Sequence, residues 1–145
     1  MYTESEVLDF VEEEDVKFIR LVFFDVTGKQ KNISIMASQL KRAFELGIAF
    51  DASAITGFQK TNKSDLYLHP DPSTLSILPW RPNTGKVCRM FCNICYPDGT
   101  PYEKDYRHLW QNAVKQAQED CGVTINIGSE VEFYRFKLDE YGNPT

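Results

Sequence analysis

The chain has 145 residues, 42% hydrophobic and 26% charged, a composition typical of one folded domain rather than of a disordered segment. Its net charge of −5 argues against non-specific binding to nucleic acid or to anionic membrane, because both need a basic protein surface. The sequence has no apolar run of bilayer length, and its start, MYTESEVLDF, is too acidic for a secretory signal. We therefore expect a cytoplasmic protein with no nucleic-acid and no membrane partner.

The first third of the chain predicts a helix, a pair of strands and a second helix. Thr3 and Glu6 have the spacing of a capping box, which opens a short helix that the acidic run 12–15 ends. DVKFIRLVFFDVTGKQKNISI reads as two strands around a turn, and its apolar first strand predicts an interior place in a sheet. In ASQLKRAFELG, Ser38 is the expected N-cap and Gly47 the residue that ends the helix.

The rest of the chain predicts short strands, then one long helix and a last strand. IAFD begins as a strand and leads into a polar loop, and strands return at 66–68, at 74–78 and in KVCRMFCNICY. The turn-rich PDGTPYEKD is the expected domain boundary. YRHLWQNAVKQAQEDCG predicts the longest helix and VTINIGSEVEFYRFKL a strand. The expected fold class is α+β, with domains over residues 1–102 and 103–145.

Three of the four cysteines lie in CRMFCNIC, whose C-x3-C-x2-C spacing raises the question of a metal site. The same segment reads as a buried strand in which cysteine is a small apolar residue, and no histidine lies close in sequence. The structural interpretation is favoured, with thiols kept reduced. The two histidines, which are isolated, are interpreted as structural or solvent-facing.

Asp51, in FDASAITGF, follows a short strand and is expected on an ordered loop, where functional residues often lie. Taken alone, the pattern more often marks an Asx turn or a helix cap, and Ser53 a local backbone partner. Asp65 has no role that its surroundings define. Arg107 falls in the first turn of a helix, where the macrodipole disfavours a cation, which indicates a partner held elsewhere.

Glu130 and Glu132 lie two residues apart in GSEVEFYRF, so on a strand they share one face, roughly 6.5–7 Å apart. Two such carboxylates raise each other's pKa unless a cation lies between them. Magnesium and manganese prefer hard oxygen ligands, and two-metal sites for phosphoryl transfer use carboxylates in this way. The spacing alone leaves a metal-ligand role and an ordinary strand face equally open.

Five segments follow one another along the chain: VKFIRLVFFDVTGKQKNI, FDASAITGF, SDLYLHPDPSTLSILPW, DGTPYEKDYR and GSEVEFYRF. In this order they resemble the N-terminal part of bacterial type I glutamine synthetases, which are glutamate–ammonia ligases. The resemblance implies a β-grasp-like N-terminal domain, followed by the first helix and strand of a larger catalytic domain. It implies ATP-dependent joining of ammonia to glutamate through γ-glutamyl phosphate, in a dodecamer of stacked hexameric rings with active sites between subunits.

The resemblance also implies residue roles. Asp51 matches the catalytic aspartate that binds ammonium and helps to deprotonate it, and Ser53 is a further candidate for substrate binding. Glu130 matches a ligand of the Mg²⁺ or Mn²⁺ ion nearer the ATP phosphates, and Glu132 a ligand of the ion that holds glutamate. Asp51 and the glutamates of one chain would serve different active sites and be well separated. Because the family's nucleotide site lies beyond this segment, we expect the chain alone to be inactive.

Departures from the family pattern leave two alternatives open. Ala52 and Ala54 replace a glycine and a serine, Tyr106 and Ser129 replace prolines, and Lys60 stands where some members carry a regulatory arginine. These changes allow a relative that forms γ-glutamyl amides from amines. The alternative of another class is a non-catalytic β-grasp interaction module, against which the retained acidic residues argue.

Overall fold

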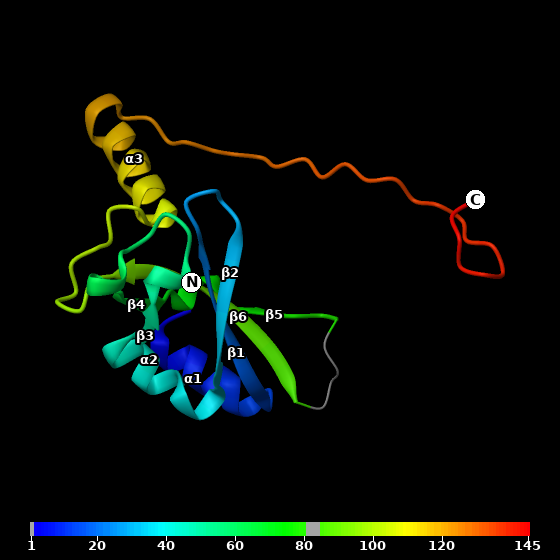
Figure 1. Ribbon diagram of the computed structural model, residues 1–145, viewed down its shortest axis with the longest axis horizontal. Helices are drawn as coiled ribbons and strands as arrows, with labels where there is room; N and C mark the ends of the chain where they lie inside the picture. The colour runs from blue at the N-terminus through cyan, green and yellow to red at the C-terminus, as the bar shows by residue number, and fades with distance from the viewer. Residues whose placement is uncertain (1, 81–84) are drawn as a thin grey trace.

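The computed structural model describes residues 2–80 and 85–145, and a mixed sheet forms its centre (Figure 1). The strand order is β2-β1-β6-β4-β3, with β5 also paired to β6. The strands are β1 (Val16–Phe24), β2 (Gln30–Met36), β3 (Ile48–Asp51), β4 (Asp65–Pro70), β5 (Ser76–Ile77) and β6 (Lys86–Cys95). The helices are α1 (Glu4–Glu13), α2 (Leu40–Leu46) and α3 (Tyr106–Cys121), and short 3₁₀ turns are η1 (Ala37–Gln39), η2 (Ala52–Ala54), η3 (Thr61–Lys63) and η4 (Pro72–Thr74). The expected α+β class is confirmed.

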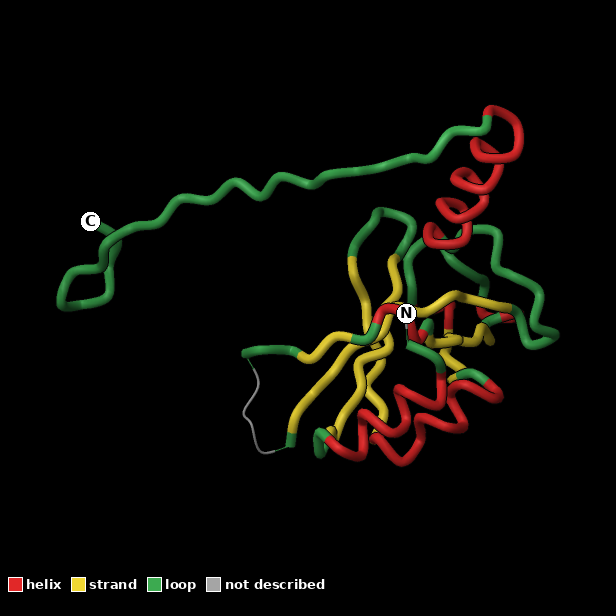
Figure 2. Tube along the Cα trace, turned by 180° about the vertical axis from the view of Figure 1, so that it is seen from behind, coloured by secondary structure: helices red, strands yellow, loops and turns green. Residues whose placement is uncertain are grey.

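The core lies between one face of the sheet and the helices α1 and α2, which lie side by side (Figure 2). β1 and β6 are parallel neighbours inside the sheet, with Ile19 opposite Cys88 and Leu21 opposite Met90. All four of these side chains are fully buried. The interior position expected for the first strand is therefore confirmed. Burial removes apolar surface from water, which is the main force that holds such a layer together.

Of the two helix caps predicted from the sequence, the one at α1 is confirmed and the one at α2 is wrong. The capping box is present: the Glu6 carboxylate accepts from the Thr3 amide at 2.7 Å, and the Glu6 amide donates to the Thr3 hydroxyl at 3.3 Å. The expected Ser38 cap is wrong, because residues 37–39 form a 3₁₀ turn. Its bond from the Leu40 amide to the Ala37 carbonyl satisfies a donor that a side-chain cap would otherwise serve.

Cys88 and Cys92 of β6 are part of the core, while Cys95 at the end of the strand is partly exposed. Cys88 and Cys92 are 0% and 1% exposed, in agreement with their interpretation as small apolar residues. Burial raises the pKa of the Cys88 thiol to about 12 and raises that of Cys92 as well. Both thiols therefore stay protonated and unreactive at neutral pH.

Polar side chains fix the start of α3 on the sheet. Asp105, which is 1% exposed, accepts from the Ile94 amide of β6 at 3.0 Å and from the Arg107 amide at 3.1 Å. The Arg107 guanidinium donates to Asn93 at 2.9 Å and pairs with the Asp71 carboxylate. The partner expected for Arg107 is thus confirmed, and the charge disfavoured at a helix start is neutralised from a neighbouring loop.

The strand expected after α3 is not formed. Residues 122–137 have no regular structure, and Figure 1 shows this segment running away from the domain. Only an isolated bridge between Leu138 and Pro144 follows it. A strand needs the hydrogen bonds of a neighbouring strand, and no described part of the chain lies beside this one.

Within the described residues, none of the helices combines the length and the apolar character that crossing a bilayer requires.

The turn between β1 and β2 is built on Asp25, which is 5% exposed. Its carboxylate accepts from the Thr27 hydroxyl at 2.6 Å and from the amides of Thr27 and Lys29 at 2.9 and 3.0 Å. These bonds, led by the Thr27 hydroxyl and helped by the nearby Lys31 ammonium, lower the pKa of Asp25 from 3.8 to about 2, against the effect of burial. The ionised form is the one that this turn stabilises.

We predict that stability falls as the pH drops from about 4 to about 2, because folding then has to hold Asp25 ionised while the unfolded chain takes up a proton. Asp25→Asn should lower stability at pH 7 and flatten this part of the pH profile, measured by urea unfolding. Asp98→Asn, in an exposed turn whose carboxylate accepts from the Thr100 amide at 2.9 Å, is the comparison and should flatten it less. Equal slopes for Asp25→Asn and the parent chain would contradict the prediction.

Candidate functional site

Asp51 is the last residue of the edge strand β3, and its side chain is exposed. Its Oδ1 accepts from the Ser53 hydroxyl at 2.6 Å and from the Ser53 amide at 2.9 Å, so it caps the turn η2. The Ser53 hydroxyl, followed by the amides of Ser53 and Ala54, lowers the pKa of Asp51. The structure thus brings Asp51 and Ser53 together, in the capping geometry that the sequence pattern favours when taken alone.

Successive backbone hydrogen bonds fix the path of the loop that follows Asp51. The Ala52 amide donates to the Ser64 carbonyl at 2.7 Å, which ties the loop to the start of β4. The Ile55 amide donates to Ala52, and the Phe58 amide to Ile55, each at 3.1 Å. Ala52 and Phe58 are buried, while Asp51 between strand and loop stays in solvent. The Asp51 carboxylate is therefore exposed, while the loop that follows it is fixed by backbone hydrogen bonds and by its buried residues.

Asp65 is the direct cross-strand partner of Asp51 in the β3–β4 register. Both side chains are exposed, and the Asp65 Oδ1 accepts only a long 3.4 Å bond from the Ser64 hydroxyl. Like charges opposite one another weaken a strand pair. Sequence reasoning left Asp65 without a role, because the proximity follows from a register that spans a 13-residue polar loop.

Glu130 and Glu132 lie on the extended segment after α3, and both are exposed. The rings of Tyr134 and Phe136 are 6.3 Å apart, which shows that residues two apart in this segment can share one side. Neither glutamate touches Asp51, whose hydrogen bonds go to Ser53, and the segment leads away from β3 (Figures 1 and 2). Within one chain the two groups are therefore apart.

The donor chemistry of Glu130 and Glu132 suits a hard divalent cation, but two side chains fill only part of its coordination shell. Among residues 2–80 and 85–145 no group of three or more His, Cys, Asp and Glu side chains is arranged to hold a metal ion. A metal held by this pair would need further ligands, from water or from other protein groups.

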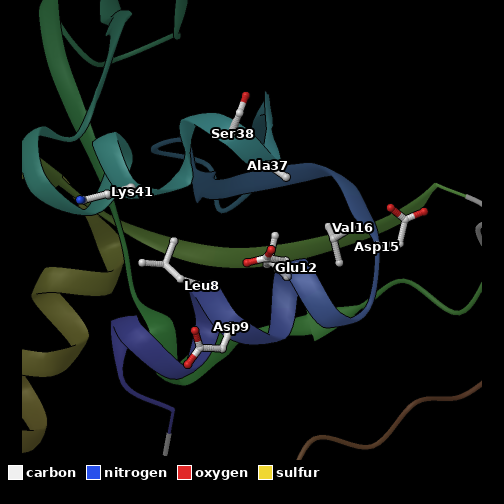
Figure 3. Close-up of a pocket in the computed structure, with 9 residues that line it drawn as sticks. Leu8, Asp9, Glu12, Asp15, Val16, Ala37, Ser38 and Lys41 are labelled. Atoms are coloured by element: carbon white, nitrogen blue, oxygen red, sulfur yellow. The ribbon is translucent and has the colours of Figure 1, made fainter.

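A groove of about 430 Å³ lies between α1 and the start of α2 (Figure 3). Asp9, Glu12 and Asp15 line it, together with Lys41 from α2. Leu8 is among the apolar residues that line it. None of the site residues expected from the sequence lines this groove, so it is separate from the candidate site.

Residues 15–97 match the family model described as glutamine synthetase, beta-Grasp domain. A curated relative named glutamine synthetase, from Methanosarcina mazei, is 49% identical over 143 residues, covering 99% of this chain and 32% of the relative. Those from Clostridium saccharobutylicum and Staphylococcus aureus are 44% and 43% identical with the same coverage. The chain thus spans about a third of the length of these relatives.

Two solved structures share the fold. Plasmodium falciparum glutamine synthetase, determined by cryo-electron microscopy, has a TM-score of 0.74 at 19% identity, covering 83% of this chain and 23% of that one. GmaS in complex with ADP has a TM-score of 0.71 at 22% identity, covering 78% and 25%. At these identities the likeness concerns the fold alone.

Gly57 sets the path of the loop after Asp51. Its φ is +83°, and an added Cβ would lie 2.4 Å from Cγ2 of Val26 at the tip of the β1–β2 turn. Gly99 has nearly the same φ, +84°, with open space around it. Substitutions at the two glycines therefore allow the cost of the left-handed backbone to be distinguished from the cost of the steric contact.

We predict that Gly57→Ala lowers the free energy of unfolding by about 1–3 kcal/mol more than Gly99→Ala does, because both pay the left-handed backbone cost and only Gly57→Ala adds the collision. Urea unfolding of both variants measures the difference. Combining Gly57→Ala with Val26→Ala should recover part of it. Equal losses at Gly57 and Gly99 would show that the loop does not rest on the turn.

Proposed function

The chain belongs to the glutamine synthetase β-grasp family, and on this premise we propose that it is the N-terminal portion of a glutamate–ammonia ligase. The proposed reaction joins ammonia to glutamate, with ATP, through γ-glutamyl phosphate. The observation that carries the proposal is the family match over residues 15–97, which includes the whole loop on which Asp51 is presented. We place the protein in the cytoplasm, with residues 1–102 as the β-grasp domain and 103–145 as the start of a catalytic domain.

In this proposal Asp51 binds ammonium. Ser53 holds one carboxylate oxygen in place, and its hydrogen bonds lower the pKa of Asp51 by stabilising the ionised form. A carboxylate of low pKa attracts a cation but is a weak base, so the geometry supports binding and orienting ammonium more strongly than removing its proton. Ser53 then acts by fixing the direction of the Asp51 carboxylate.

Glu130 and Glu132 are proposed as ligands of Mg²⁺ or Mn²⁺, the ions that their carboxylate oxygens suit. Such an ion, when bound, polarises phosphoryl and carboxylate oxygens and neutralises their charge. The contribution of this chain is to supply two of the ligands on one extended segment. Because this segment and β3 are apart in one chain, we propose a homo-oligomer in which Asp51 of one copy completes the active site that contains the glutamates of another.

A fusion protein tests the proposed activity. Residues 1–145 of this chain replace the matching N-terminal segment of the M. mazei relative, to which they are 49% identical over 143 residues. We expect ATP-dependent formation of glutamine by the fusion and none by the 145-residue chain alone. A folded fusion without turnover would refute the proposal, and a preference for methylamine over ammonium would favour the alternative of an amine ligase.

Within the fusion, Asp51→Asn should lower kcat/KM for ammonium by about 100-fold or more, because the charge that attracts the cation is removed. Steady-state kinetics at varied ammonium concentration measure this loss. Asp98→Asn removes the same charge from another turn-capping aspartate and is the matched control, expected to leave the kinetics unchanged. Unchanged kinetics in Asp51→Asn would remove this residue from the active site.

Glu130→Gln and Glu132→Gln in the fusion should each raise the Mn²⁺ concentration needed for half-maximal activity by about tenfold or more, since a charged ligand becomes neutral. Electron paramagnetic resonance of Mn²⁺ gives the affinity without turnover. Glu140→Gln, on the exposed turn that follows, is the control. Equal Mn²⁺ affinity in all three variants would count against the metal role of the pair.

A further inference from the structure

We propose that Lys104 is a positioning residue for Asp51, because it holds the loop 52–60 against the segment that begins α3. The inference rests on the proposed function, since it concerns the support of the carboxylate that is proposed to bind ammonium. Lys104 stands outside the site itself and acts through the backbone of the loop.

The contact is a double one. The Lys104 ammonium donates to the Gly57 carbonyl at 3.1 Å and to the Phe58 carbonyl at 3.3 Å. These two carbonyls lie at the far end of the loop from Asp51. A charged donor shared between two carbonyls makes stronger bonds than a neutral one would, and it holds both peptide groups in one orientation.

Backbone hydrogen bonds within the loop connect this contact to Asp51. The Phe58 amide binds Ile55, the Ile55 amide binds Ala52, and the next residue, Ser53, donates twice to the Asp51 carboxylate. The turns that these bonds close fix the path from Lys104 to the carboxylate. Release of the carbonyl end therefore loosens the donors that orient Asp51.

A second bridge runs beside the first. The Gln59 side chain donates to the Tyr96 hydroxyl at 3.2 Å, and this hydroxyl donates to the Glu103 carboxylate at 2.7 Å. Glu103 and Lys104 thus hold neighbouring points of one loop from one short segment. The loop is attached to this segment rather than lying freely over it.

Lys104 can act as a fixed point because its own backbone is anchored on both sides. Tyr102 is fully buried, and Asp105, 1% exposed, binds the Ile94 amide of β6. The backbone that carries the lysine side chain is therefore held in place on the sheet. Lys104 also lies just before α3, which starts at Tyr106 and is followed by the segment with Glu130 and Glu132. Lys104 thereby links the support of the proposed ammonium residue to the start of α3, and the segment that follows α3 carries the proposed metal ligands. These two groups serve different active sites in the proposed oligomer.

Lys104→Met in the 145-residue chain tests the link, because it keeps the aliphatic stem and removes the donors. We expect hydrogen exchange at the Ile55 and Phe58 amides to speed up at least fivefold, and the carboxyl pKa of Asp51, followed by ¹³C NMR, to move up towards its ordinary value. Lys104→Arg keeps the charged donors and should restore both readouts. Lys60→Met removes an equal charge from the same loop and is the control for electrostatics alone.

The inference is overturned if Lys104→Met leaves both readouts at the level of Lys60→Met, or if all amides of the domain exchange faster to the same degree, which would indicate general destabilisation. These measurements need no catalysis, so they stand whether or not Asp51 binds ammonium. In the fusion protein, Lys104→Met should raise KM for ammonium three- to tenfold with little change in kcat. An unchanged KM, with Asp51→Asn still impaired, would overturn the inference while leaving the proposed function in place.

Discussion

The parallel pairing of β1 with β6 is the constraint on which the rest of the domain depends. Parallel neighbours cannot be joined by a tight turn, so the chain between them has to cross the sheet. This crossing contains α2, β3 and β4, and it places β3 at the edge of the sheet. The buried row that β1 and β6 share keeps this arrangement in one register, because a shift of one residue would turn the apolar side chains of a strand to the solvent face.

The edge position explains how a charged residue can be both exposed and well held. β3 has only four residues and ends at Asp51, so the carboxylate is free of the sheet while the strand is not. The β4 register then sets Asp65 opposite Asp51, and like charges opposite one another cost stability. A bound cation would turn this cost into attraction, which is consistent with the proposed role in ammonium binding.

Much of the fold follows from short-range signals that the sequence displays directly. The capping box of α1 and the turn between β1 and β2 use residues within four positions of one another, so local chemistry is enough to place them. The contact of Lys104 with Gly57 joins residues 47 positions apart, and no spacing rule reveals it. The pairing of Asp51 with Asp65 likewise depends on a register that the core selects. The prediction of a Ser38 cap is wrong because the same amide donors can be satisfied by a side-chain cap or by a 3₁₀ turn, and the sequence does not distinguish the two.

The expected last strand shows most clearly what a sequence pattern leaves open. A strand-like composition indicates that a segment can pair with a neighbouring strand, but it does not indicate whether such a neighbour is present. GSEVEFYRF has the composition of a strand, yet Val131 and Phe133 are 82% and 79% exposed. Fixing the backbone of these nine residues costs on the order of 10 kcal/mol, at about 1–2 kcal/mol for each. Two carboxylate contacts to a magnesium ion that surrenders its water reluctantly cannot offset that cost alone. In the proposed enzyme, pairing with neighbouring strands would therefore have to supply the rest of the free energy that orders this segment, so that Glu130 and Glu132 could act as a preorganised pair of metal ligands.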